Sequence, residues 1–145
     1  NYKIKKEEIS LELPSNSLIA VLVGHHSVNL VKLEKLIERI DFKKVVTMGS
    51  IGCKLTSIVR GESDIYISMP MPGGSGPKDW DFAAPEAVLK AAGGSITTID
   101  NEELIYGKEN FEHSGIIIAS KNKDMHKSIC MNLKEIIKEH SICPL

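Results

Sequence analysis

Three features that would assign this 145-residue sequence to a class are missing from it. There is no excess of charge, because 18 Lys and Arg residues face 19 Asp and Glu residues, which leaves no electrostatic basis for binding nucleic acid or an anionic membrane. There is no long apolar run: SLIAVLVG and GIIIAS are strand-sized, whereas a membrane span needs roughly 20 residues. No signal peptide is visible, and three cysteines cannot all pair within the chain. We therefore expect a cytoplasmic protein without nucleic-acid or membrane partners.

The remaining composition is typical of one globular domain. The chain is 42% hydrophobic and 26% charged, and it contains no internal repeat or low-complexity linker. Strands are predicted at residues 8–12, 18–23, 44–48, 64–68, 95–99 and 115–120, and helices at residues 27–40, 50–60, after Trp80 as far as Gly93, and at 124–140. This alternation predicts an α/β domain in which a mixed sheet is flanked by helices.

Polar groups gather at three predicted strand-to-helix junctions. These are GHHS (24–27), GSIGCK (49–54) and DWD (79–81). Ligands of open α/β sheets bind where strand ends meet helix starts. Backbone N–H groups and Lys54 suit a phosphate, and Asp81 suits Mg²⁺. The alternative, that these residues only cap helices, stays open.

The third junction leads into an alanine-rich helix, DFAAPEAVLKAAGG. Its alanine spacing predicts a small, close-packing face, and Gly93 and Gly94 supply its end. Asp81 falls in the first turn, where a carboxylate is favoured by unpaired N–H groups and by the helix dipole. We expect Trp80 to pack into the domain, so that Asp81 points into a cleft rather than back onto N–H groups of its own helix.

These segments resemble a known family. GSIGCKLTSIVRGESDIYI, a variable loop and then WDFAAPEAVLKAAGGSITTID are similar to the inositol monophosphatase-like, magnesium-dependent, lithium-sensitive phosphatases. Pro85 and the GHHS segment resemble more closely the 3'(2'),5'-bisphosphate nucleotidases, which remove a phosphate from 3'-phosphoadenosine 5'-phosphate. The resemblance runs from about residue 18 to residue 120. It implies the second domain of the sugar-phosphatase fold.

The resemblance also implies roles for individual residues. Asp81 matches a metal-ligand aspartate that faces the reacting phosphate, and His26 matches a histidine that contacts the nucleotide. Lys54 matches a lysine near the non-scissile phosphate, while Ser50 and Gly52 match the backbone cradle before it. The departures from the family pattern bear on the substrate rather than on the metal chemistry: Ser50 replaces a frequent Gly, Gly24 replaces an Arg, and Ser68 replaces an Arg that holds the second phosphate in some members.

Other elements of the family pattern are absent. The chain has no Asp-Pro-x-Asp-Gly-Thr motif, and the acidic pair Glu102-Glu103, which could imitate the family's Glu-Glu loop, falls in a predicted turn. One carboxylate cannot hold the two or three Mg²⁺ ions that the resemblance implies. The chain, residues 1–145, therefore resembles a carboxy-terminal domain alone, with residues 1–17 as the join to a missing amino-terminal domain. It begins with Asn1 rather than Met, as a piece of a longer protein would.

We therefore expect the domain of a Mg²⁺-dependent phosphatase acting on a small phosphate ester, inactive alone and able to form a homodimer through its uncovered surface. An inositol monophosphatase or sugar bisphosphatase domain is an alternative. A non-catalytic phosphate-ligand or protein-interaction module is another.

A second metal pattern is weaker. His126, Cys130, His140 and Cys143 superficially resemble a zinc site, and the first two could share a helix face. A domain of this size folds without structural zinc, so we discount this interpretation.

Overall fold

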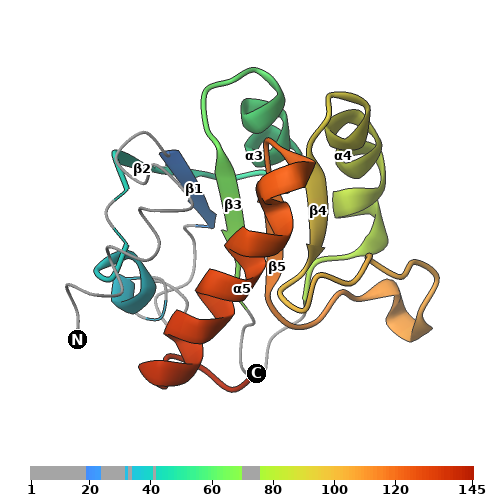
Figure 1. The fold of residues 1–145 in the computed structure, drawn as a ribbon. Coiled ribbons are helices and arrows are strands. Elements are labelled where there is room, and N and C mark those ends of the chain that lie inside the picture. Colours follow the sequence, from blue (N-terminus) through green and yellow to red (C-terminus); the bar gives the residue numbers. More distant parts are fainter. Residues whose placement is uncertain (1–18, 24–31, 33, 41, 70–75) are drawn as a thin grey trace.

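The structure is a computed structural model that describes residues 19–23, 32, 34–40, 42–69 and 76–145. Five strands form one sheet in the order β2-β1-β3-β5-β4 (Figure 1). They are β1 (Ile19–Val23), β2 (Lys44–Met48), β3 (Ile65–Ser68), β4 (Ser95–Thr98) and β5 (Ile117–Ser120). β1 is parallel to β2 and β3, whereas β5 is antiparallel to β3 and β4. The prediction of a mixed sheet flanked by helices is confirmed.

Helices cover both faces of this sheet. α3 (Ile51–Val59) and α4 (Asp79–Ala91) lie on one face, and α5 (Lys123–Glu139) lies on the other (Figure 1). Residues 34–37 are also helical, and a short 3-10 helix, η2, spans Glu109–Phe111. None of the described helices is long and apolar enough to cross a membrane.

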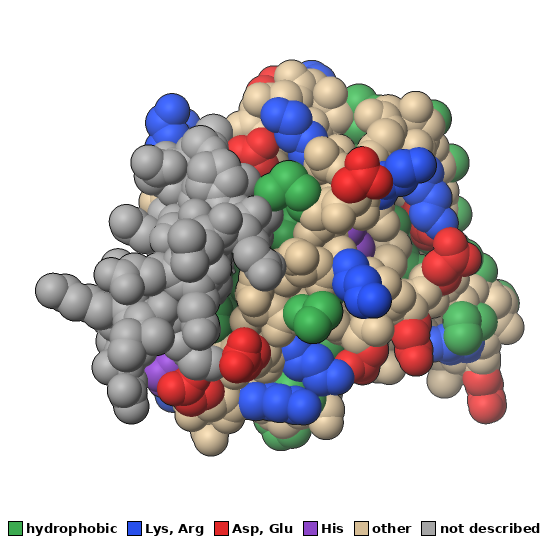
Figure 2. All heavy atoms as spheres, viewed as in Figure 1, with side chains coloured by type: hydrophobic (Ala, Val, Ile, Leu, Met, Phe, Trp, Pro, Cys, Tyr) green, Lys and Arg blue, Asp and Glu red, His purple; other side chains and the backbone are tan. Residues whose placement is uncertain are grey.

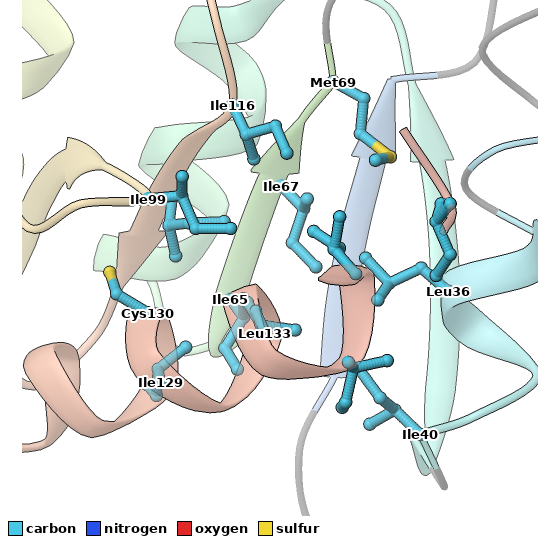
Figure 3. Packing of buried hydrophobic residues seen from close by; sticks show 14 residues of the cluster. Leu36, Ile40, Ile65, Ile67, Met69, Ile99, Ile116, Ile129, Cys130 and Leu133 are labelled. Atoms are coloured by element: carbon cyan, nitrogen blue, oxygen red, sulfur yellow. The ribbon is translucent and has the colours of Figure 1, made fainter. Parts of the chain in front are cut away.

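The alternation of side chains along the strands divides the core in two. Ile65 and Ile67 of β3 face α5, whereas Tyr66 between them faces α3 and α4. The α5 side of the sheet is lined mainly by isoleucine and leucine (Figure 3). The opposite cluster is formed by Leu55, Ile58, Tyr66, Phe82, Leu89, Ile96, Leu104, Ile117 and Ala119.

The start of α3 and the ends of α3 and α4 follow the predicted signals, whereas α4 begins at Asp79, before Trp80 rather than after it. The Ser50 side chain caps α3 by accepting a hydrogen bond from the N–H of Cys53 at 3.4 Å. Gly61 after α3 and Gly93 after α4 have φ angles of +75° and +91°, the left-handed conformation that glycine adopts without strain. The predicted strand at 8–12 lies outside the described residues, and so does much of the predicted helix at 27–40.

The close-packing alanine face predicted for α4 is wrong. The buried positions of α4 are Phe82, Glu86 and Leu89, spaced by four and three residues. Each residue turns an α-helix by about 100°, so most of the alanines fall on the opposite side from these three. That side carries Trp80, Ala84, Ala87, Val88 and Ala91, all exposed in this structure.

On the opposite side of the molecule, the face that carries α5 is polar. Acidic and basic side chains are interspersed over the described part of this face rather than gathered by sign (Figure 2). This distribution agrees with the balanced charge of the sequence.

Candidate functional site

Asp81 occupies the third position of α4, and its carboxylate has one engaged and one free oxygen. The Oδ2 atom accepts a hydrogen bond from the Lys78 backbone N–H at 2.8 Å. The prediction that Asp81 turns away from the N–H groups at its helix start is therefore wrong for this oxygen. The Oδ1 atom has no hydrogen-bond partner within the described part of the chain. Capping and ligand binding are thus compatible, since each needs one oxygen.

Trp80 does not pack into the domain, contrary to prediction. It is 68% exposed, and its ring lies 6.2 Å from that of Phe111, at an angle of 47°. The reason is again helical rotation: Trp80 is two residues, or about 200°, from the core-facing Phe82. Asp81, not Trp80, lies nearer the buried side of this turn.

The start of α4 is held by Asp79 instead. Its carboxylate accepts hydrogen bonds from the Gly107 N–H at 2.8 Å and from His113 Nε2 at 2.7 Å. His113 is buried, and its ring packs edge-on against Phe82 and Tyr106. Sequence analysis did not identify this pair, because 34 residues separate its members. The contacts fix where Asp81, two residues further on, enters the site.

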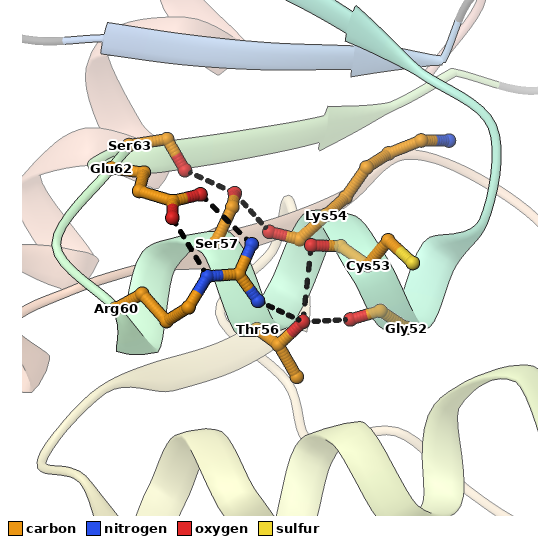
Figure 4. A network of polar contacts seen from close by, with 8 residues as sticks. All are labelled: Gly52, Cys53, Lys54, Thr56, Ser57, Arg60, Glu62 and Ser63. Carbon is orange, nitrogen blue, oxygen red and sulfur yellow. Dashed lines mark hydrogen bonds and ion pairs between the residues drawn. The ribbon is translucent and has the colours of Figure 1, made fainter.

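Lys54 is a buried cation without a counter-ion in the described structure. Its side chain is fully buried, and its Nζ atom has no hydrogen-bond partner among the residues described. The ammonium lies 5.7 Å from the centroid of the Tyr66 ring. Burial lowers the pKa of Lys54 to about 8, which still leaves the amine mostly protonated at neutral pH. The side chain runs beneath the sheet towards the carboxyl ends of β1 and β3 (Figure 4).

Tyr66 is a site residue that sequence analysis missed. It is fully buried, and its hydroxyl also lacks a hydrogen-bond partner within the described residues. Burial raises the pKa of Tyr66 to about 12; the side chain of Ser68, which lies close to the hydroxyl without making a hydrogen bond of normal geometry, opposes this shift, and the negative charge of Asp81 adds to it. Tyr66 thus lies near Lys54 of α3, and its hydroxyl is within the electrostatic influence of Asp81 on α4. The available signal was strand alternation, which separates Tyr66 from the neighbouring isoleucines in DIYIS.

Ser50 and Gly52 form the first turn of α3, as predicted. The Ser50 carbonyl accepts the Lys54 N–H at 3.1 Å, and the first N–H groups of a helix have no partner within it. A Cβ atom added at Gly52 would lie 3.5 Å from Ser50 Oγ and 3.7 Å from Pro85 Cγ. The start of α3 thus lies against α4, the helix that carries Asp81.

Polar contacts at the far end of α3 join this helix to the turn that leads into β3 (Figure 4). The Ser57 hydroxyl donates to the Lys54 carbonyl at 2.6 Å and lies 2.6 Å from the Ser63 hydroxyl. Arg60 donates two hydrogen bonds of 2.8 Å to Glu62. None of these contacts uses the Lys54 ammonium, which extends in the opposite direction (Figure 4).

The structure thus brings Lys54, the first turn of α3 and Asp81 to one region of the sheet. His26, and with it the prediction that it lies near Lys54, falls outside the described residues. Among the residues described, no three His, Cys, Asp or Glu side chains are placed to hold a metal ion.

Two residues of the predicted zinc pattern, His126 and Cys130, lie in α5 and make hydrogen bonds within the protein instead. Thr97 Oγ1 lies 2.7 Å from His126 Nε2, and Ser120 Oγ lies 2.7 Å from Nδ1. Cys130 lies 3.5 Å from His126 Nε2, and burial raises the pKa of its thiol. Both ring nitrogens are occupied by hydroxyls, so this group joins α5 to β4 and β5.

The chain is similar in sequence to known proteins of one family. The family model of the inositol monophosphatase family matches residues 2–138. The 3'(2'),5'-bisphosphate nucleotidase 1 of Mus musculus is 29% identical over 119 residues, which cover 81% of this chain and 37% of that protein. The protein of the same name from Homo sapiens is 28% identical over 119 residues, with the same coverage. The chain therefore spans less than two-fifths of the length of these relatives.

Solved structures share the fold. An IMPase from Thermotoga maritima superposes with a TM-score of 0.63 at 19% identity, covering 86% of this chain and 43% of that one. SaIMPase-II in complex with inositol monophosphate gives a TM-score of 0.64 at 19% identity, covering 88% and 45% respectively. The family match spans nearly the whole sequence, and with the shared fold it shows that this chain belongs to the inositol monophosphatase family.

Proposed function

We propose that this chain is the carboxy-terminal domain of a Mg²⁺-dependent phosphomonoesterase that removes the 3'-phosphate of 3'-phosphoadenosine 5'-phosphate. The observation that carries the proposal is the buried ammonium of Lys54, which has no counter-ion in the described structure. A buried charge is costly unless an opposite charge pairs with it. A phosphate group of the substrate would supply that charge. The similarity to nucleotidases supports the choice of a nucleotide.

Each candidate residue has a part in this proposal. Lys54 binds the non-scissile phosphate, with the N–H groups around Ser50 and Gly52 as further donors. His26 contacts the nucleotide. Ser68, where some family members have an arginine for the second phosphate, contributes only a neutral hydroxyl beside Tyr66.

Asp81 would hold the metal. Its free Oδ1 atom is a hard oxygen donor of the kind that Mg²⁺ prefers. When bound, Mg²⁺ activates water and stabilises charge on the leaving oxygen. Because one carboxylate is too few for such ions, the remaining protein ligands would come from the amino-terminal domain. These 145 residues alone would then be inactive.

A second candidate is an inositol monophosphatase or sugar bisphosphatase. One solved structure of this fold contains inositol monophosphate, and another, with a TM-score of 0.56, contains 2'AMP. From a different class, a non-catalytic phosphate-binding module would use Lys54 in the same way but would need no metal at Asp81.

The test is a phosphatase assay of the full-length protein on 3'-phosphoadenosine 5'-phosphate and inositol 1-phosphate, with and without Mg²⁺. We expect Mg²⁺-dependent release of phosphate, faster from the nucleotide. Faster hydrolysis of inositol 1-phosphate would favour the second candidate. Binding without turnover of either compound would favour the non-catalytic module, and activity of residues 1–145 alone would contradict the two-domain proposal.

A further inference from the structure

We propose that Tyr66 completes the anion site of Lys54: its ring positions the ammonium, and its hydroxyl is a second donor to the same anionic group of the ligand. This inference rests on the proposed function, because it takes Lys54 to be a substrate-binding residue. It adds a residue that the sequence motifs do not identify.

The first support is the pattern of unsatisfied groups. Within the described residues, three buried side-chain nitrogen or oxygen atoms have no hydrogen-bond partner: Arg39 Nε, Lys54 Nζ and Tyr66 Oη. Two of the three thus belong to neighbouring side chains in one layer of the molecule. Buried polar groups in native proteins are almost always hydrogen-bonded, so a pair of adjacent exceptions indicates a missing partner common to both.

The second support is the chemistry of the pair. An ammonium can only donate hydrogen bonds, and a phenol can donate one. An acceptor with several lone pairs, such as a phosphate oxygen, would satisfy both groups, whereas a second cation would be repelled by Lys54. Burial and the charge of Asp81 both favour the neutral phenol, so the hydroxyl keeps its proton and stays a donor at neutral pH.

The third support is the position of the ring. The Lys54 ammonium lies 5.7 Å from its centroid, within the range of a cation–π contact. Such a contact favours an ammonium over a neutral amine, and it holds a long flexible side chain in one place. The ring thus explains how Lys54 can remain extended in a buried position before a ligand binds.

The test compares two tyrosines in the full-length protein. Tyr66→Phe removes a hydroxyl that makes no hydrogen bond of normal geometry within the described residues, and the matched control Tyr106→Phe removes one that donates to Glu86. The affinities for adenosine 3',5'-bisphosphate and for inorganic phosphate are measured by titration calorimetry with Mg²⁺ chelated, so that neither ligand is held by metal or hydrolysed. Thermal melting is measured alongside.

We expect Tyr66→Phe to melt at the same or a higher temperature and to bind both ligands at least about tenfold more weakly, as for a lost hydrogen bond to a charged group. Tyr106→Phe should melt lower and bind normally. Wild-type affinity in Tyr66→Phe would overturn the inference. A third variant, Lys54→Met, separates the two proposals: if it binds both ligands normally, the anion site of the proposed function fails, and if only Tyr66→Phe binds normally, the inference alone fails.

Discussion

At the scale of the residue, the most informative feature is a buried charge whose partner is not in the described structure. Lys54 is fully buried, and burial lowers its pKa from 10.5 to about 8. Without a ligand, this ammonium should destabilise the folded state, because water solvates it freely when the chain is unfolded. Under the proposed function, this site would exchange some stability for the ability to bind an anion.

Replacing Lys54 by methionine, which has a similar volume, should raise stability at pH 7 and abolish substrate binding. The folded pKa is below the unfolded one, so the penalty is full below pH 8 and disappears as the pH rises to 10.5. The free energy of unfolding of wild type relative to Lys54→Met should thus increase by up to about 3 kcal/mol over this interval. Urea denaturation at several pH values measures it; a constant difference would contradict the burial of a charged Lys54.

The sequence could predict part of this residue-scale account. Asp81 and Ser50 were identifiable because helix starts favour carboxylates and hydroxyls, and both lie in first turns or caps. The division of the Asp81 carboxylate into one capping and one free oxygen depends on rotamers, which no pattern encodes. Identifying Tyr66 as a site residue required knowledge of which face of β3 packs against α3.

At the scale of the element, the two sides of the sheet differ in what holds their helices. α3 and α4 are positioned by contacts at their ends, at Ser57–Ser63 and Asp79–His113. α5 is joined to the sheet near its start by His126, whose two nitrogens bond to hydroxyls of β4 and β5. The imidazole of His126 is neutral in this contact at neutral pH, because burial lowers the pKa of His126 to about 4.

Acid should therefore weaken the attachment of α5. With a folded pKa below the unfolded value of 6.5, the contribution of neutral His126 is complete above pH 6.5 and is lost as the pH falls to 4. Relative to His126→Gln, wild type should lose up to about 3 kcal/mol of unfolding free energy over this range. Chemical denaturation between pH 7 and pH 4 measures the difference, and parallel curves for the two proteins would refute it.

Most elements were predictable because their signals are local. The strands at 44–48 and 64–68 alternate or form short apolar runs, and Gly61 and Gly93 mark the ends of α3 and α4. The orientation of α4 could not be predicted, because a row of small residues indicates a close contact but does not identify the partner. In this chain that face of α4 is uncovered.

At the scale of the whole molecule, α4 presents an apolar surface to solvent. Trp80 is 68% and Val88 is 47% exposed, and alanines at 84, 87 and 91 lie along the same side. The chain also spans only 37% of the length of the nucleotidases it resembles. We expect the proposed amino-terminal domain to cover this surface.

The exposure of Trp80, the only tryptophan in the sequence, can be measured directly. In residues 1–145 its fluorescence should be emitted at long wavelength, and acrylamide should quench it nearly as efficiently as free tryptophan. Adding the amino-terminal domain as a separate chain should shift the emission to shorter wavelength and reduce quenching. A protected Trp80 in the short chain would contradict the exposed α4 surface.

Metal binding by Asp81 in a phosphatase can be tested in the full-length protein with the variant Asp81→Asn. An asparagine oxygen can still accept the Lys78 N–H, so the melting temperature should change little, but its neutral amide cannot replace a carboxylate towards Mg²⁺. Asp79→Asn is the matched control, since it loses the charge that holds His113 and should lower the melting temperature. We predict that Asp81→Asn abolishes Mg²⁺-dependent turnover at nearly wild-type stability. Turnover within a few-fold of wild type, with reduced stability, would show that Asp81 only caps its helix.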